Sequence, residues 1–329
     1  MNKKQLFLMV MVLVGGVMSP ILTAHAQDDL QTTLDTLTTA YQNAAALQSY
    51  AAQWDGTTSE STQLSEGDNL YIVSTQITSA QTAQIEGANT SSSVTQTVTQ
   101  GQIVVTKPLV EGAALPEPTL ASQLELKASL VSIDGRVFIN LDETAPEYRA
   151  GLPEGWQEVR DGVALGVNGT VSLTDVAASL DNVRMDATSV LALLNPTVVK
   201  SAEALPDDEL NGQAMKRYLL TLNLAEAMTA LGQDASALLG DLELSDEAVS
   251  ALLSGATYTV EVWVGADDQT VYRHVITLNL NSELDGKSFG SDLGGATVKI
   301  SHNQSDTLTL SELNADFEIR VPAMDEVVG

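Results

Sequence analysis

The sequence contains no cysteine, only three histidines, and 15 basic residues against 43 acidic ones, which give a formal charge of −28 at pH 7. Without cysteine there can be no disulfide, so the fold must be held together by its core. The acidic excess disfavours nucleic acid as a partner and repels the chain from an anionic membrane surface. Solubility outside the cell accounts for this acidity as well as a specific role would.

The start of the chain has the pattern of a signal peptide. Lys3 and Lys4 precede an apolar run from Leu6 to Leu22, and Thr-Ala-His-Ala follows. This pattern predicts a signal peptide over residues 1–26, cleavage after Ala26, and an extracytoplasmic protein, either secreted or periplasmic. An uncleaved membrane anchor is the alternative, because the run is just long enough to span a bilayer. Cleavage would leave residues 27–329, enough for a single large domain, and a charge of −30 from 13 basic and 43 acidic residues.

The apolar period then changes along the chain. Residues spaced by three and four predict an amphipathic helix that ends near Ser49: Leu30, Leu34, Leu37, Tyr41, Ala44 and Leu47. From Tyr50 to Val105 the period is two, charges are few, and Thr, Ser and Gln are abundant. This region, which is richest in these polar residues at about 56–105, predicts long antiparallel strands. Gly87 to Ser93 is expected to be a turn, with a flexible connector as the alternative.

Three further hairpins are predicted. Asp134-Gly135 joins apolar alternation at 124–130 and 137–141, and Asn211-Gly212 leads into the apolar run that ends at Leu224. The stretch "YTVEVWVGADDQTVYRHVITLNLN", residues 258–281, reads as two strands around a polar turn at 265–269. Short helices are expected near 173–183, 190–194, 224–242 and 246–254. Trp156, which follows a loop rich in Pro and Gly, is expected to fill the core.

Residues with the chemistry for catalysis are scarce. After the predicted cleavage only His274 and His302 remain, too few for an ordinary zinc site. The sequence has no Gly-x-Ser-x-Gly elbow, phosphate-binding glycine loop or zincin helix. Asp207-Asp208-Glu209 and Asp267-Asp268 are expected in surface turns without the ligand spacing of a calcium loop. We therefore expect a protein that is not an enzyme and has no catalytic residue, metal or cofactor; a hydrolase using one of these acidic pairs is the remaining enzymatic alternative.

Four segments resemble those of a known family: "VFINLDETAPEYRAGLPEGWQEV", "LNGQAMKRYLLTLNL", "YTVEVWVGADDQTVYRHVITLNL" and "LSELNADFEIRVPAMDE". They lie between Arg136 and Glu326, and the last carries the family's closing pattern at Asn314, Phe317, Ile319 and Pro322. On these segments the chain resembles the LolA/LolB-like lipoprotein-carrier superfamily, and within it the mycobacterial LppX and LprG glycolipid-binding group. Two features differ from that group: the lipobox cysteine is absent, and the Thr/Ser/Gln-rich region is longer than such proteins need.

The resemblance implies an α+β fold in which a curved antiparallel sheet, an incomplete β-barrel, has helices covering its concave apolar face. It also implies a secreted, non-enzymatic lipid or lipoprotein carrier that holds acyl chains between sheet and helices. The strands fit this fold because an apolar strand face needs a covering layer. Candidate cavity-lining residues are Tyr218, Leu220, Leu222, Tyr258, Val260, Val262, Tyr272, His274 and Ile276; the alternative is that they form only the core under the helices. The expected partner is a lipid or acylated molecule. An acidic scaffold of the cell envelope that binds a protein partner, and no lipid, is the alternative function.

Overall fold

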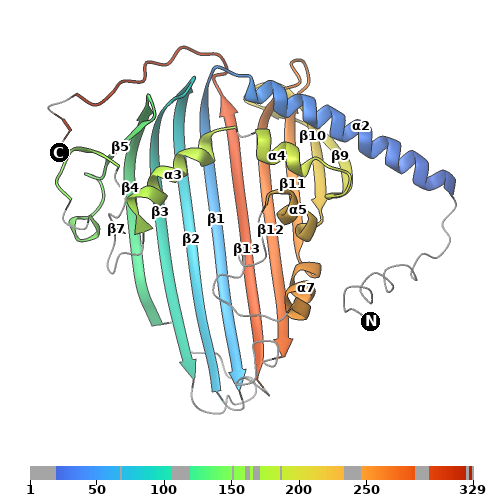
Figure 1. The fold of residues 1–329 in the computed structure, drawn as a ribbon, viewed down its shortest axis with the longest axis horizontal. Helices are drawn as coiled ribbons and strands as arrows, with labels where there is room; N and C mark the ends of the chain where they lie inside the picture. The colour runs from blue at the N-terminus through green and yellow to red at the C-terminus, as the bar shows by residue number, and fades with distance from the viewer. Residues whose placement is uncertain are drawn as a thin grey trace, which may run out of the picture.

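The computed structural model describes residues 20–66, 69–105, 119–149, 152–159, 164–165, 171–185, 187–232, 246–285, 296–323 and 326–327. Its main feature is an 11-stranded antiparallel sheet with the strand order β6-β5-β4-β3-β2-β1-β13-β12-β11-β10-β9 (Figure 1). The strands are β1 (Ser49–Glu66), β2 (Asn69–Glu86), β3 (Asn89–Val105), β4 (Thr119–Ile133), β5 (Arg136–Asn140), β6 (Trp156–Glu158), β9 (Val199–Leu210), β10 (Gln213–Leu222), β11 (Thr257–Gly265), β12 (Val271–Asp285) and β13 (Thr297–Ser311). A separate two-stranded sheet pairs β7 (Ala164–Leu165) with β8 (Val171–Ser172).

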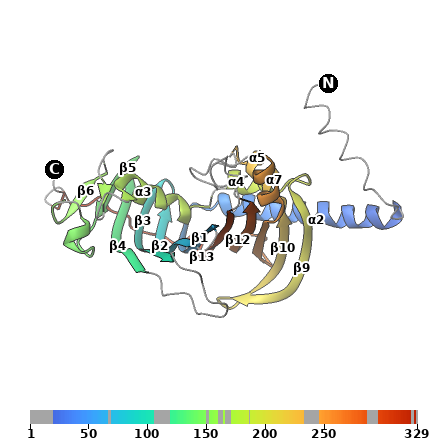
Figure 2. The ribbon, with the colours of Figure 1, turned by 90° about the horizontal axis from the view of Figure 1, so that it is seen from below.

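Helical segments precede or connect the strands of this sheet. They are α2 (Pro20–Ala45), η1 (Pro146–Tyr148), α3 (Leu173–Ala178), η2 (Ser179–Val183), α4 (Ala187–Leu193), α5 (Leu224–Ala230) and α7 (Asp246–Ser254). Figure 2 shows that the sheet curves, most strongly at β9 and β10, and that α3, α4, α5 and α7 lie on its concave side. The sheet stays open between its edge strands β6 and β9. The predicted α+β fold class, with helices on the concave face of an open antiparallel sheet, is confirmed.

The largest hydrophobic core lies beneath α2. The residues predicted from helical spacing are buried here: Leu34, Leu37, Tyr41 and Ala44 face the sheet and are at most 1% exposed. The sheet contributes the alternating apolar residues of β10 and β11, together with the start of β1 and the end of β13. A second core packs α3 and η2 on β3, β4 and β5, and a third packs α7 on β12 and β13. The helix ends at Ala45, before the predicted Ser49, because β1 begins at Ser49.

The Thr/Ser/Gln-rich region forms β1, β2 and β3, as predicted. The turn expected at 87–93 is shorter, since Gly87 and Ala88 alone join β2 to β3 and Asn89 already pairs with Glu86. Gly87 has a φ of +58°, a conformation that glycine adopts without strain. β1 also pairs with β13, so the first and last long strands of the chain lie side by side at the centre of the sheet.

Two local predictions were wrong. Asp207, Asp208 and Glu209 lie in strand β9, not in a surface turn, because β9 continues to Leu210 and the hairpin turn falls at Asn211-Gly212. Trp156 is only partly buried and does not fill a core, because it lies in the short edge strand β6.

The N-terminal predictions remain open. Residues 1–19 of the predicted signal peptide lie outside the described residues, and α2 begins at Pro20. Among the helices of the described chain, none combines the length and the apolar character needed to cross a bilayer. The expected helix at 224–242 is α5 up to Ala230, and residues 233–245 lie outside the described part of the chain.

Candidate functional site

A cavity of about 580 Å³ lies between the concave face of the sheet and the η2–α4 segment. The strands β1, β2, β3, β12 and β13 form its floor, and residues from η2 to α4 form its other wall. Its lining residues are Trp54, Gly56, Thr58, Ile77, Ser79, Gln96, Asp181, Asn182, Arg184, Ser189, Val190, His274, Ile276, Gln304, Asp306 and Leu308. The cavity therefore lies where a helical layer covers the sheet, near its centre.

The register of the strands explains which side chains meet on this floor. His274, Leu308 and Trp54 form one cross-strand row, since His274 is opposite Leu308 and Leu308 is opposite Trp54. In the next row Ile276 is opposite Asp306, which is opposite Gly56. Side chains in such a row point to the same face of the sheet. Two groups of strands that are far apart in the sequence, β1 to β3 and β12 with β13, thus contribute to one surface.

The floor contains a polar stripe as well as apolar residues. Ser79 and Gln96 continue the row of Gly56 across β2 and β3, and Asp306 lies at its other end. Burial raises the pKa of the Asp306 carboxyl, while the Gln304 amide donates a hydrogen bond of 2.5 Å to it and acts in the opposite direction. A ligand with a hydrogen-bonding group between apolar parts would match this arrangement.

Gly56 shapes the floor beside Asp306. A Cβ at this position would lie 2.5 Å from two ring carbons of Trp54 and 2.9 Å from a carboxylate oxygen of Asp306. The Trp54 ring therefore lies directly over the Gly56 backbone, and any side chain there would displace it. The resulting apolar surface faces the cavity.

His274 joins the cavity to α2. The hydroxyl of Tyr41 lies 3.3 Å from Nδ1 of His274, and Tyr41 is fully buried. Burial lowers the pKa of His274 to about 4, so the imidazole is neutral at pH 7. Burial also raises the pKa of Tyr41, which keeps its phenol protonated. This pair holds α2 to β12 without introducing a charge into the cavity wall.

A second hollow of about 460 Å³ adjoins the first at the end of the sheet. Asp181 and Arg184 line both, so the η2 segment lies between the two. The Arg184 guanidinium donates hydrogen bonds of 2.5 Å to the Ala88 carbonyl and 2.7 Å to the Thr90 hydroxyl. The Tyr50 hydroxyl accepts a hydrogen bond of 3.0 Å from the Met185 amide. We call this set of contacts the η2 clasp, because it ties η2 and the following residues to β1 and to the β2–β3 hairpin.

The nine predicted lining residues fall into three groups. His274 and Ile276 line the cavity. Leu220, Leu222, Val260 and Val262 are buried in the core under the helices, and Tyr218 and Tyr258 pack against that core. Tyr272 lies at a register shift between β11 and β12, where its hydroxyl donates a 2.7 Å hydrogen bond to Asp268. Direct contact between these residues and a ligand stays a prediction.

The sequence reasoning missed most of the floor. The residues that were not selected include Trp54, Ile77, Gln96 and Asp306. In their strands Thr, Ser and Gln occur on both faces, so no clear apolar face marks the side that points to the cavity. Leu308 in β13 was not selected either. Only the pairing of β1 with β13 and of β13 with β12 brings these residues to His274 and Ile276.

The residues considered for catalysis do not converge. His302 lies in β13 with its Nδ1 3.1 Å from a Glu60 oxygen. Asp267 and Asp268 lie in the predicted turn between β11 and β12, while Asp208 accepts a 3.1 Å hydrogen bond from the Trp263 indole in strand β11. Within the described residues, no group of three or more His, Cys, Asp or Glu could hold a metal ion.

The fold and the cavity define a class: an open antiparallel sheet whose helix-covered face encloses a cavity. Solved structures similar to this chain include LppX from Mycobacterium tuberculosis, at 11% identity over 88% of this chain and 99% of LppX, with a TM-score of 0.33. LprF from Mycobacterium bovis matches at 12% identity over 89% and 98%, with a TM-score of 0.32. A putative outer membrane lipoprotein-sorting protein domain from Vibrio parahaemolyticus matches at 10% identity over 88% and 95%, with a TM-score of 0.18.

These matches include LppX, to whose group the sequence motifs point. No family model matches the chain, and no curated protein does. Since every TM-score is below 0.5, these likenesses do not determine what the chain binds, and its own cavity must indicate that.

Proposed function

We propose that this protein is a secreted, non-enzymatic carrier of lipids or lipoproteins that holds acyl chains between the sheet and the helices. The observation that carries the proposal is the cavity of about 580 Å³ beneath η2 and α4. Its volume falls in the usual range for small-molecule sites, about 300–1,000 Å³. The N-terminal pattern of a signal peptide supports an extracytoplasmic location.

Apolar side chains on both walls of the cavity could contact an acyl chain. Trp54, Ile77, Ile276 and Leu308 lie on the floor, and Val190 of α4 faces them. Burial of a chain of about sixteen carbons would contribute on the order of 10 kcal/mol before ordering costs, at roughly 0.8 kcal/mol per methylene. The polar stripe around Asp306 and Gln96 could form hydrogen bonds with the ester, amide or hydroxyl groups near a lipid head. Binding of this kind needs no catalytic residue.

Lipid extraction tests the proposal directly. Organic extraction of the purified protein should yield acyl lipids by mass spectrometry, and delipidated protein should rebind a fluorescent fatty acid. Val190→Trp would fill the cavity from α4 and should reduce rebinding at least tenfold. Thr188→Trp on the same helix is the matched control, because Thr188 is exposed and lies outside the cavity lining.

The alternative function predicts a different outcome. An acidic envelope scaffold without a lipid ligand would contain no extractable lipid and would not rebind the probe while remaining folded. Both Trp variants would then behave like the parent protein. That result would contradict the carrier proposal.

A further inference from the structure

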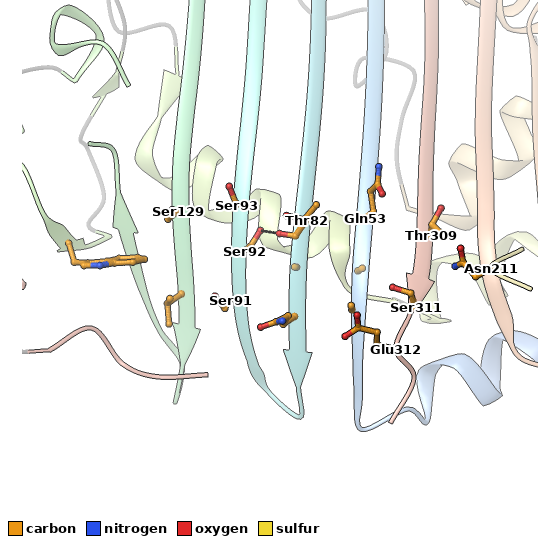
Figure 3. A pocket seen from close by; sticks show the side chains of 16 residues that line it. Gln53, Thr82, Ser91, Ser92, Ser93, Ser129, Asn211, Thr309, Ser311 and Glu312 are labelled. Atoms are coloured by element: carbon orange, nitrogen blue, oxygen red, sulfur yellow. Dashed lines mark hydrogen bonds between the residues drawn. The ribbon is translucent and has the colours of Figure 1, made fainter. Parts of the chain in front are cut away.

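The opposite face of the sheet, on which none of the described helices lies, carries a groove of about 700 Å³. Figure 3 views this groove with the helices behind the sheet. Its labelled side chains come from β1, β2, β3, β4 and β13, from Glu312 directly after β13, and from Asn211 in the β9–β10 turn. The groove is therefore separate from the cavity of the proposed function, which opens on the other face.

One cross-strand row crosses this face. Cα pairing links successive members on seven neighbouring strands: Thr309, Gln53, Thr82, Ser93, Ser129, Asn140 and Trp156. We call this set the polar row. Neighbouring strands are about 4.8 Å apart, so the six steps of the polar row extend over roughly 29 Å. Gln53, Thr82 and Ser93 at its centre are exposed. The result is a line of hydroxyl and amide groups at regular intervals.

The groove is almost free of charge, in contrast to the rest of the chain. Of the 16 lining residues only Glu312 is ionisable. The whole chain carries a formal charge of −28. An anionic ligand would be repelled by this field, and a cationic ligand would find only one carboxylate in the groove. Hydroxyl and amide groups both donate and accept hydrogen bonds, so they suit a neutral ligand that is rich in hydroxyl groups.

Trp156 supplies an aromatic surface at one end of the polar row. It lines the groove and also a second hollow of about 270 Å³, which shares Ser93 and Ser129 with the groove. The Trp156 amide donates a 3.0 Å hydrogen bond to the Glu326 carbonyl, which fixes its backbone to the C-terminal segment. An indole with one apolar body and one polar tip, held at the edge of a polar surface, can stack against the apolar face of a sugar ring.

From this arrangement we propose that the groove binds a neutral glycan chain laid across the strands along the polar row. The interval between strands is close to the length of one pyranose unit, so successive sugars meet successive hydroxyl or amide side chains. Trp156 stacks on a sugar at one end, and the side chains of Thr309, Gln53, Thr82, Ser93 and Ser129 form hydrogen bonds with the hydroxyl groups of the glycan. This site acts independently of the acyl-chain cavity on the other face.

Calorimetric titration with cellohexaose, maltohexaose and N-acetylated chitohexaose tests the proposal. The full chain should bind at least one of them at millimolar concentration or below. Trp156→Ala should weaken that binding about tenfold, and Trp156→Phe should retain most of it. Thr82→Glu should weaken binding strongly, because it removes the hydroxyl at the centre of the polar row and fills the groove there with a longer side chain. No binding of any of the three oligosaccharides would overturn the proposal.

Thr57→Glu is the matched control for Thr82→Glu. Thr57 is exposed on the same face in the neighbouring strand β1, but it lies outside the groove. It should leave glycan binding unchanged, and equal losses in both variants would contradict a site at the polar row. Fatty-acid rebinding should be unaffected by all of these variants, so failure of this proposal and failure of the carrier proposal are distinguishable.

Discussion

His274 links the stability of the protein to pH. Its pKa is about 4 in the folded state because of burial, against about 6.5 when unfolded. The unfolded state therefore binds the proton first, and the stability contributed by neutral His274 is complete above pH 6.5 and is lost as pH falls toward 4. We expect this group alone to lower the free energy of unfolding by up to about 3 kcal/mol between pH 7 and pH 4.

Urea unfolding across this pH range measures the effect. His274→Gln, which does not titrate, should show a smaller loss of stability than the parent protein between pH 7 and pH 4. Tyr41→Phe removes the hydroxyl beside Nδ1 but leaves the histidine buried, so it should retain the pH dependence. Equal pH slopes for His274→Gln and the parent would exclude His274 as the source.

The ionised carboxyl of Asp306 should lower the stability of the folded protein at neutral pH. Burial raises the pKa of its carboxyl, so the ionised form present at pH 7 costs stability. Asp306→Asn keeps the shape and can still accept the hydrogen bond from Gln304. We expect it to raise the free energy of unfolding at pH 7 by on the order of 1 kcal/mol. The gain should vanish near pH 3, where the parent carboxyl is protonated; a loss of stability at pH 7 would show that the charge has a stabilising partner.

At the scale of elements, the η2 clasp is the contact set that separates the cavity from the adjoining hollow. Arg184→Ala removes the guanidinium hydrogen bonds to Ala88 and Thr90. Because η2 would then be held chiefly through Tyr50 and its own packing, we expect a bound fluorescent fatty acid to dissociate several-fold faster. Stopped-flow displacement measures this rate. Arg136→Ala, which breaks the surface pair with Glu158 at the far side of the sheet, should leave it unchanged.

Most of the strands and helices could be predicted from the sequence. Period-two alternation identified β11 and β12, and their inward residues Val260, Val262, His274 and Ile276 do share the concave face. Tyr272 shows the limit of this reasoning. A register shift places Val271, not Tyr272, opposite Val264. Counting by two from Tyr258 cannot detect one inserted residue, since the shift depends on the geometry of the turn.

The residues on the floor of the cavity could not be predicted from the sequence, for a different reason. Ser79, Gln96 and Asp306 point inward although they are polar, so no hydrophobic pattern marks their face. Their position follows from the pairing of β1 with β13, strands separated by more than 200 residues in the sequence. Local periodicity carries no information on such a distant pairing.

At the scale of the whole molecule, the acidic excess acts against the compact state. With 43 acidic and 15 basic residues the folded protein concentrates negative charge, and self-repulsion destabilises it. Salt screens this repulsion, since the Debye length falls from about 30 Å at 0.01 M to about 8 Å at 0.15 M. We therefore expect the melting temperature to rise by about 2–5 °C over this range of NaCl.

Thermal unfolding followed by intrinsic tryptophan fluorescence measures this rise. Choline chloride should act like NaCl at equal ionic strength, because screening depends on charge and concentration alone. A rise with only one of the two salts would indicate binding of a specific cation, and a melting temperature independent of both would show that the negative charges are too far apart to interact. Thr57→Glu and Thr82→Glu add one charge each and should lower the melting temperature at 0.01 M more than at 0.15 M.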